Sequence, residues 1–270
     1  MTHNALSVET PAKQSSIGPR WDTVDLVRGI AIVLMALDHV REFLQADQID
    51  PTDLEKTTPA LFFTRWVTHF CPLIFVLLAG VGISLGISRG QSRVLQSRFL
   101  LIRGLWLVFL ELTVVHLGWF FNFNFHSALG QVIWTIGWSM VCMSVLVYLP
   151  TPVVALIGVS LIAGHNAFDR VSPDRFGQFG WIWRFLHAGG PIAGPVVREN
   201  TPLFIYIAYP LIPWVGVMAV GVGFGNLVAG HFPARRRLVA LIGLPMIVLF
   251  AVLRGGNIYG NPSPWTTQTT

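Results

Sequence analysis

The sequence predicts an all-α protein, a polytopic bundle of about seven transmembrane helices. Of its 270 residues, 53% are hydrophobic and only 11% are charged, and the mean hydropathy is +0.61. A soluble domain carries about 25% charged residues, so this composition is that of an integral membrane protein. The apolar runs are continuous rather than alternating, which favours helices over strands.

Seven apolar stretches approach the length of about 17–25 residues that a spanning helix needs. They cover 24–44, 66–88, 99–121, 129–149, 152–168, 203–229 and 238–254. The fifth is short and follows Pro150 and Pro152, so half of a tight hairpin with the fourth is the alternative. Backbone polar groups find no water in the bilayer core, and we therefore expect all seven stretches to be helical.

The ends of the chain differ from this apolar body. Residues 1–21 are polar and lack the apolar core of a signal peptide, so we expect a flexible cytoplasmic tail. A single membrane domain is expected over 22–270. Its last residues, 255–270, are rich in turn-forming glycine and proline, and we expect the domain to be truncated at the C-terminus.

Arginine predicts the orientation. The connection after the second stretch contains Arg89, Arg93, Arg98 and Arg103, the connection after the sixth contains Arg235, Arg236 and Arg237, and neither contains an acid. The positive-inside rule places both connections, and with them the N-terminus, in the cytoplasm. The net charge of +5 then reflects topology, and no nucleic-acid partner is expected.

The first stretch holds the most informative polar residues, among them Asp25, Arg28, Asp38 and His39. A charge at the centre of a spanning helix costs about 2.5–3.5 kcal/mol on insertion scales, so such residues are functional candidates. Arg28 and His39 share one helix face, because eleven residues make about three turns and a rise of about 16 Å.

Chemistry can be assigned to each of these residues. His39 is a candidate general base or proton carrier, because imidazole titrates near neutral pH. Asp38 is its candidate catalytic partner, although a neighbouring residue points about 100° away on a helix. Asp25 and Arg28 can pair, and Arg28 could hold an anionic cofactor phosphate. The alternatives are a satisfied interfacial histidine and a structural ion pair.

Two further stretches contain polar or small residues that need explanation. His69 precedes a run in which Pro72 starts or kinks the helix, and Gly82 and Gly86 would allow close helix approach. In the third stretch, Glu111 is a buried acid for which we expect a histidine or arginine partner on another helix.

The later segments offer two more binding candidates. His187 lies in the long segment 169–202, whose aromatic and polar residues suit a polar acceptor or, alternatively, an interfacial re-entrant segment. Pro210 and Pro213 remove backbone donors from the sixth stretch, so Trp214 either lines a cavity there or simply packs. No zinc-type spacing is present, and no metal site is expected.

Six sequence blocks in this order resemble one family. They are DLVRGIAIVLMALDH, THFCPLIFVLLAGVGISL, GQVIWTIGWSM, FLHAGG, YPLIPWVGVMAVG and RGGNIYGNPSPW. Together they resemble the heparan-alpha-glucosaminide N-acetyltransferase-like membrane proteins of bacteria, over residues 20 to 265. The spacing of Arg28 and His39 is also similar to that of the wider transmembrane acyltransferase superfamily.

The resemblance implies a multi-pass protein of the bacterial inner membrane that uses acetyl-CoA as acyl donor. His39, with Asp38, would be catalytic, and Arg28 and Asp25 would lie on the cofactor side. The acceptor would be a hydroxyl or amine of a cell-envelope glycan or glycolipid. We assign His69, His187 and Trp214 to substrate binding by their place in these blocks and segments.

Several alternatives stay open. His39 could deprotonate the acceptor in a ternary complex or carry the acetyl group transiently. The protein could instead be a transporter or permease with a polar pathway along the first span, or a non-catalytic subunit of an envelope complex. Besides the lipid bilayer, acyl-CoA and the acceptor, a second copy of the chain is a possible partner.

Overall fold

The computed structural model describes residues 22–44, 50–53, 55–123, 125–198, 201–229 and 235–256. The predicted tail, 1–21, and residues 257–270 lie outside the described part of the chain. Most of the described residues are helical, as the composition predicted.

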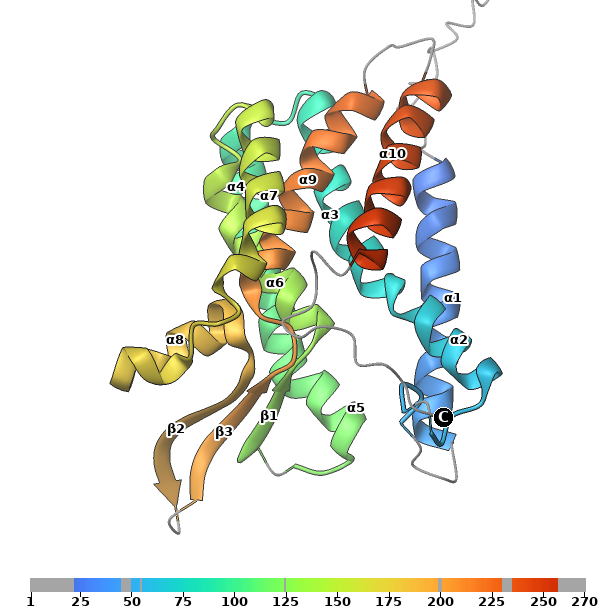
Figure 1. The fold of residues 1–270 in the computed structure, drawn as a ribbon. Helices are drawn as coiled ribbons and strands as arrows, with labels where there is room; N and C mark the ends of the chain where they lie inside the picture. Colours follow the sequence, from blue (N-terminus) through green and yellow to red (C-terminus); the bar gives the residue numbers. More distant parts are fainter. Residues whose placement is uncertain are drawn as a thin grey trace, which may run out of the picture.

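The first half of the fold is built of helices that succeed one another along the chain (Figure 1). Its elements are α1 (Asp22–Leu44), α2 (Pro59–Thr68), α3 (Phe70–Ser88), α4 (Arg93–Leu110), a π-helical turn (Glu111–Val115) and α5 (His116–Phe120). Pro72 lies in the first turn of α3, where its missing N–H costs no hydrogen bond, so this proline starts the helix.

The second half alternates helices with a small sheet. Its elements are β1 (Ser127–Gly130), α6 (Val132–Leu146), α7 (Thr151–Gly164), two 3₁₀ turns (His165–Phe168 and Pro173–Phe179), α8 (Gly180–Trp183), a π-helical turn (Arg184–Ala188), β2 (Gly190–Arg198), β3 (Thr201–Ile207), α9 (Leu211–Ala229) and α10 (Arg235–Gly255). In Figure 1 the sheet, α2, α5 and α8 lie at the lower end, and the start of α1 lies at the upper end.

Within the described part of the chain, four helical segments are long and apolar enough to cross a membrane. They are Pro59–Ser88, Arg93–Phe120, Thr151–Phe168 and Arg237–Gly255. The cores of α6 and α9 are apolar but shorter, and α1 has the length but carries charges. Successive long helices run in opposite directions in Figure 1. Seven full spans, and a cytoplasmic N-terminus, stay predictions.

The three-stranded sheet was not expected. Its order is β1-β3-β2, with β1 parallel to β3 and β2 antiparallel to β3. The prediction that all seven stretches are helical is therefore wrong where the fourth and sixth begin. Gly189 and Gly190 have positive φ angles of 66° and 86°, which favour glycine and turn the chain into β2.

Proline also explains why the sixth stretch starts as a strand. Pro210 directly precedes α9 and Pro213 lies in its first turn, so the helix cannot extend back through them. Neither proline interrupts the middle of a helix, which corrects our expectation of a broken span. The break is instead a junction between strand β3 and helix α9.

The apolar core lies between α3, α4, α6, α7 and α9, and Val76, Leu100, Met143 and Met218 are completely buried in it. Glycine permits this packing: a Cβ atom at Gly80 would overlap the carbonyl oxygen of Met218 on α9. Helix α3 thus approaches its neighbour at Gly80, and the prediction of close helix approach at Gly82 and Gly86 is wrong, because these two glycines face side chains of Arg28 and of two glutamines.

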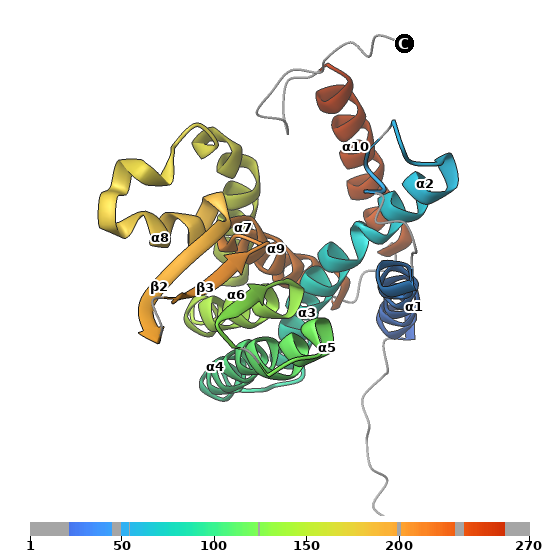
Figure 2. The same ribbon diagram turned by 90° about the horizontal axis from the view of Figure 1, so that it is seen from below.

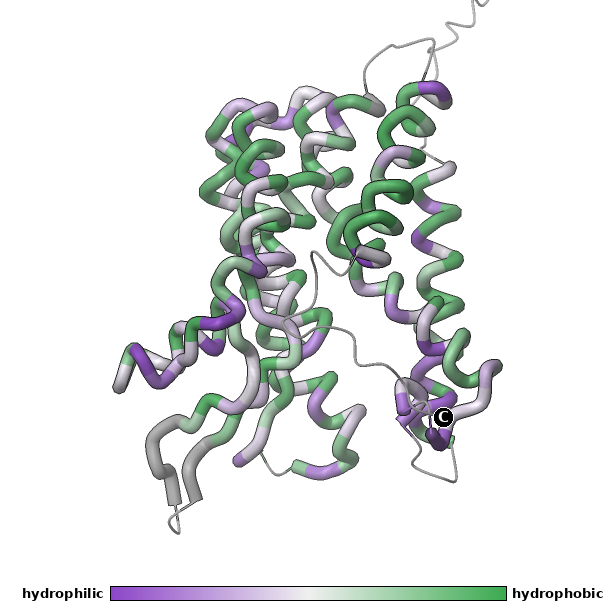
Figure 3. Tube along the Cα trace, in the orientation of Figure 1, coloured by the Kyte–Doolittle hydropathy of each residue, from purple (hydrophilic) through white to green (hydrophobic). Residues whose placement is uncertain are grey.

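The outer surface is apolar as well. Figure 3 shows hydrophobic residues along the upper helices and more hydrophilic ones near α8 and the lower end of α1. None of the apolar window of α10 is buried, and this helix stands at the edge of the molecule (Figure 2). Large exposed apolar surfaces of this kind are typical of a membrane protein.

Candidate active site

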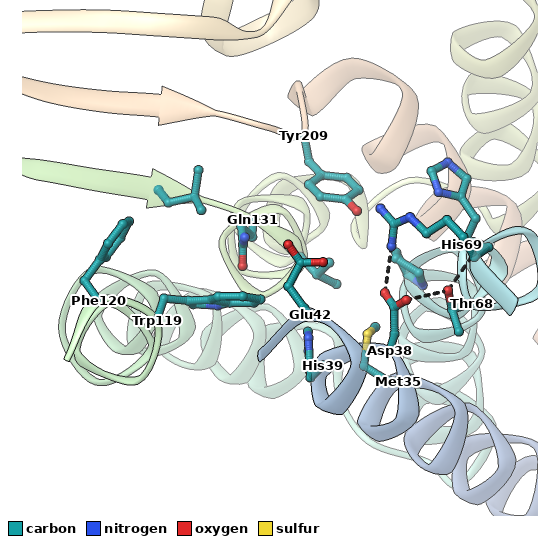
Figure 4. Close-up of a pocket in the computed structure, with 14 residues that line it drawn as sticks. Met35, Asp38, His39, Glu42, Thr68, His69, Trp119, Phe120, Gln131 and Tyr209 are labelled. Atoms are coloured by element: carbon teal, nitrogen blue, oxygen red, sulfur yellow. Dashed lines mark hydrogen bonds and ion pairs between the residues drawn. The ribbon is translucent and has the colours of Figure 1, made fainter. Parts of the chain in front are cut away.

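A cavity of about 330 Å³ opens beside the lower half of α1 (Figure 4). Its walls come from α1, from the junction of α2 and α3, from α5, and from the segments that follow β1 and β3. It is lined by Met35, Asp38, His39, Glu42, Arg65, Thr68, His69, Pro72, Trp119, Phe120, Leu129, Gln131, Val132 and Tyr209. Three of the sequence-predicted site residues, Asp38, His39 and His69, therefore meet here.

Asp38 is the most constrained of these side chains. It is 7% exposed, and its carboxylate accepts hydrogen bonds from Arg65 Nη1 at 2.7 Å and from Thr68 Oγ1 at 3.0 Å. Arg41 Nη2, one turn along α1, lies 2.8 Å from the same carboxylate. The Asp38 carboxylate thus binds two arginine side chains and one hydroxyl. Since Arg65 and Thr68 belong to α2, these bonds hold α1 against α2.

His39 points into the cavity beside this network. Its ring meets Trp119 edge-on, with ring centroids 5.2 Å apart and an interplanar angle of 85°. In Figure 4 the Asp38 side chain lies beside Thr68, whereas His39 lies on the side of Trp119, and both line the cavity. The imidazole is therefore held by an aromatic contact and by the position of α1, while Asp38 faces Arg65 and Thr68.

The wall opposite α1 carries aromatic and amide groups. Trp119 and Phe120 come from α5, and Gln131 lies at the start of α6. Tyr209 is held by Thr135, whose hydroxyl donates a hydrogen bond of 2.9 Å to the carbonyl oxygen of Tyr209. A flat aromatic surface beside hydrogen-bonding groups suits a polar molecule with an apolar face, such as a sugar.

A second cavity, of about 490 Å³, lies beside the upper half of α1. It is lined by Arg28, Phe75, Ala79, Gly82, Ile83, Gln96, Phe99, Leu100, Arg103, Leu107, Ile136 and Met140. Both cavities are bordered by α1, α3 and α6. Arg28 and His39, eleven residues apart on α1, therefore border two successive cavities, about 16 Å apart along the axis.

Arg28 is held more loosely than Asp38. Its Nη2 donates a hydrogen bond of 3.1 Å to the carbonyl oxygen of Leu78 on α3. The predicted pair with Asp25 is present at 3.9 Å, but the Asp25 side chain is 62% exposed. Gly82 leaves room for the guanidinium, because a Cβ atom there would lie 3.5 Å from Arg28 Nη2.

The second cavity contains groups that fit an anionic ligand with amide groups. Arg28 and Arg103 supply positive charge, and the guanidinium of Arg103 lies 5.5 Å from the centre of the Phe99 ring. The Oε1 atom of Gln96 is buried and has no hydrogen-bonding partner among the described residues. A buried carbonyl oxygen without a partner is costly, so this atom is suited to accept a bond from a ligand.

His187 and Trp214 do not line either of these cavities. His187 is 8% exposed, and its Nε2 lies 3.2 Å from Asp169 Oδ1, among aromatic rings near the end of α7. Trp214 contacts Tyr209, with ring centroids 5.2 Å apart, and otherwise packs against the core. Trp214 thus touches a cavity residue, while His187 belongs to a separate cluster.

Sequence reasoning missed Arg65 and Thr68 as partners of Asp38. They precede His69 on α2 at spacings that place Arg65, Thr68 and His69 on one helix face, which was a usable signal. Sequence reasoning also missed Gln131, because no periodic pattern identifies a residue between a strand and a helix as part of a site. Among the residues that the structure describes, no three potential metal ligands come together.

Comparison with known proteins gave one match. The model of the family described as "Heparan-alpha-glucosaminide N-acetyltransferase, catalytic" matches residues 20–255. No curated protein and no solved structure matched the chain. The matched range contains α1 and every residue that lines the two cavities.

Proposed function

Because the chain belongs to the heparan-alpha-glucosaminide N-acetyltransferase catalytic family, we propose that it transfers an acetyl group from acetyl-CoA to a cell-envelope glycan or glycolipid. Membership implies a membrane acyltransferase. The proposal adds cytoplasmic acetyl-CoA as donor, a hydroxyl or amine as acceptor, and the bacterial inner membrane as location. The predicted orientation puts the Arg28 cavity nearer the cytoplasm and the His39 cavity nearer the outside.

The placement of Arg28 and His39 in successive cavities along α1 carries this proposal. A donor that enters on the cytoplasmic side would meet the positive charge of Arg28 and Arg103. An acceptor on the outer side would meet His39 and His69. The acetyl group would then have to travel only about half of the ~30 Å hydrocarbon core.

The reaction can follow one of two balanced routes. In the direct route, His39 removes the proton from the acceptor, the acceptor atom bonds to the acetyl carbon, and the thioester C–S bond breaks. The proton then passes to the thiolate of CoA. In the covalent route, the imidazole of His39 bonds to the acetyl carbon and the C–S bond breaks, so that CoA leaves as a thiolate. The acceptor atom then bonds to the acetyl carbon as the bond to the imidazole breaks, and the acceptor's proton replaces the one that the thiolate takes up.

His69 and Tyr209 are the groups most suited to orient the acceptor. Both line the His39 cavity, and both carry side chains that donate and accept hydrogen bonds. Asp38 serves the site by fixing α1 against α2 rather than by accepting a proton, because its oxygens already receive bonds from Arg65 and Thr68.

The test uses the full chain in proteoliposomes with radiolabelled acetyl-CoA and an envelope extract as acceptor. We expect CoA release and labelled extract from the wild type, and loss of both in His39→Ala. His126→Gln, which changes a histidine that does not line the His39 cavity, is the matched control and is expected to behave as wild type.

The two routes separate in the same assay. Without acceptor, the covalent route leaves labelled protein and one equivalent of free CoA, whereas the direct route leaves neither. Wild-type protein that releases no CoA with any extract would contradict the proposal and favour a transporter or a non-catalytic subunit.

A further inference from the structure

Glu111 is a buried acid that the proposed reaction does not yet use. It is 1% exposed, and it begins the π-helical turn between α4 and α5, inside a segment apolar enough to cross a membrane. Burying a carboxyl group in such a segment costs free energy, so we treat Glu111 as a candidate for a functional role. We expected a histidine or arginine partner on another helix, but its carboxylate binds a backbone amide instead.

That amide belongs to the cavity wall. The N–H of Gln131 donates a hydrogen bond of 2.8 Å to Glu111 Oε1, while Oε2 has no partner among the described residues. Gln131 is the N-cap of α6 and makes no capping bond with its own side chain. In a capping box, a Glu three residues into the helix binds the N–H of the N-cap. Here Trp134 occupies that position, and Glu111 supplies the bond from another helix.

The π-helical turn that Glu111 begins shapes the same wall. An α-helix turns by about 100° per residue, so a π-turn, which accommodates one extra residue, changes the face on which all later residues lie. The helix continues into α5, which places Trp119 against His39. Glu111 therefore precedes the segment that carries Trp119, and it is hydrogen-bonded to Gln131 in the other segment of the wall.

We propose that Glu111 is a positioning residue that holds the aromatic and amide wall of the cavity opposite His39. Its carboxylate fixes the end of β1 and the start of α6, and thereby places Leu129 and Gln131 at the acceptor. The expected effect of Glu111 on acetyl transfer rests on the proposed function. Its expected effect on the position of the wall does not. We expect Glu111 to affect donor binding little, because the wall residues that it positions, Leu129 and Gln131, do not line the Arg28 cavity.

Three substitutions test this role in the full chain. Glu111→Leu removes the acceptor oxygen at similar volume, and Glu111→Gln keeps an oxygen that can accept the Gln131 N–H. Thr113→Val is the matched control: it lies in the same π-turn, and its hydroxyl bonds to the carbonyl of Phe109 rather than to the wall. For Glu111→Leu we expect the acceptor KM to rise and kcat to fall, together by about 10²-fold, since catalysis is that sensitive to a displacement of 1 Å.

The KM for acetyl-CoA should stay unchanged in Glu111→Leu, and Glu111→Gln should recover most of the activity. A loss of folded protein would lower the apparent kcat and leave both KM values alone. Equal kinetics in Glu111→Leu and Thr113→Val would overturn the proposal.

A second measurement needs no turnover. In the variant Leu129→Cys, the rate at which the new thiol reacts with a thiol reagent reports the position of the wall. The rate is measured against the background of the two native cysteines. We expect Glu111→Leu to change this rate several-fold and Thr113→Val to leave it as it is. If Glu111→Leu does not fold, Glu111→Asp, whose carboxylate is one methylene shorter, must change the rate as well.

The two arms separate the two proposals. Absence of acetyl transfer in the wild type, together with a changed labelling rate, would contradict the enzyme and support the positioning role. An unchanged labelling rate in folded Glu111→Leu and Glu111→Asp would overturn the positioning role, whatever the activity of the wild type.

Discussion

The two cavities beside α1 are built in opposite ways. At the lower one, Asp38 is buried and bound by Arg41, Arg65 and Thr68, so α1 is fixed at the level of His39. At the upper one, Arg28 has one hydrogen bond to a backbone carbonyl and a loose, exposed pair with Asp25. Catalytic groups must be held within about 0.5 Å of the geometry that the reaction needs. A cavity that only admits a long flexible donor does not need this precision. The difference supports the proposed function, in which the reaction takes place in the lower cavity and the donor binds in the upper one.

The largest expected effect separates the two cavities by kinetics. His39→Ala should lower kcat by about 10²–10⁴-fold, the usual contribution of a general acid–base group. Arg28→Ala should mainly raise the KM for acetyl-CoA, by about tenfold or more, since a hydrogen bond to a charged group contributes about 1.5–3 kcal/mol. Initial-rate measurements of CoA release check both. The comparison fails if Arg28→Ala lowers kcat as strongly as His39→Ala does.

The next effect concerns the network that fixes the lower cavity. Asp38→Asn should lower the free energy of unfolding by about 3 kcal/mol, because it leaves Arg65 without its counter-charge. It also leaves the poorly exposed Arg41 with only its longer pair to Glu42, at 3.6 Å. Thr68→Val removes only one hydrogen bond from the same carboxylate and should cost about 1 kcal/mol. Unfolding in detergent, followed by tryptophan fluorescence, measures both. Equal losses would mean that Asp38 acts as an ordinary hydrogen-bond acceptor.

A smaller effect is expected from filling the space beside Arg28. In Gly82→Val the added methyl groups would displace the guanidinium from Leu78, so the KM for acetyl-CoA should rise several-fold with little change in stability. Gly29→Val is the control, because this glycine is the neighbour of Arg28 in the chain but faces open space. A rise in KM that is the same in both variants would point to α1 as a whole rather than to this contact.

Patterns of one residue type were enough to predict part of this molecule. A helix lies in each of the seven predicted apolar stretches, although seven full spans stay a prediction, and the rarity of charges in such stretches singled out α1 and its histidine. The three-stranded sheet escaped because β3 and α9 form one apolar run, and only Pro210 and the paired Gly189 and Gly190 mark the change.

The site itself was only partly predictable. Asp38, His39 and His69 were expected and meet in one cavity, whereas His187 was expected and lies in another cluster. Gln131 could not be found, since its role comes from a hydrogen bond to Glu111, twenty positions earlier in the chain. Contacts between distant segments leave no periodic trace in a sequence.

The smallest expected effect concerns the ion pair at the upper end of α1. Asp25 and Asp38 each stand three residues before an arginine on α1, so sequence spacing alone treats their ion pairs as equivalent. The pair of Asp25 is 3.9 Å long with an exposed carboxylate, and such pairs contribute at most about 1 kcal/mol. Asp25→Asn should therefore change the free energy of unfolding by less than about 0.5 kcal/mol, within the range of most surface substitutions, with the KM for acetyl-CoA nearly unaltered. A loss as large as that of Asp38→Asn, measured under the same conditions, would show that the upper end of α1 is fixed as firmly as the lower. In that case, burial and distance would not distinguish the charges that hold this helix in place from those that do not.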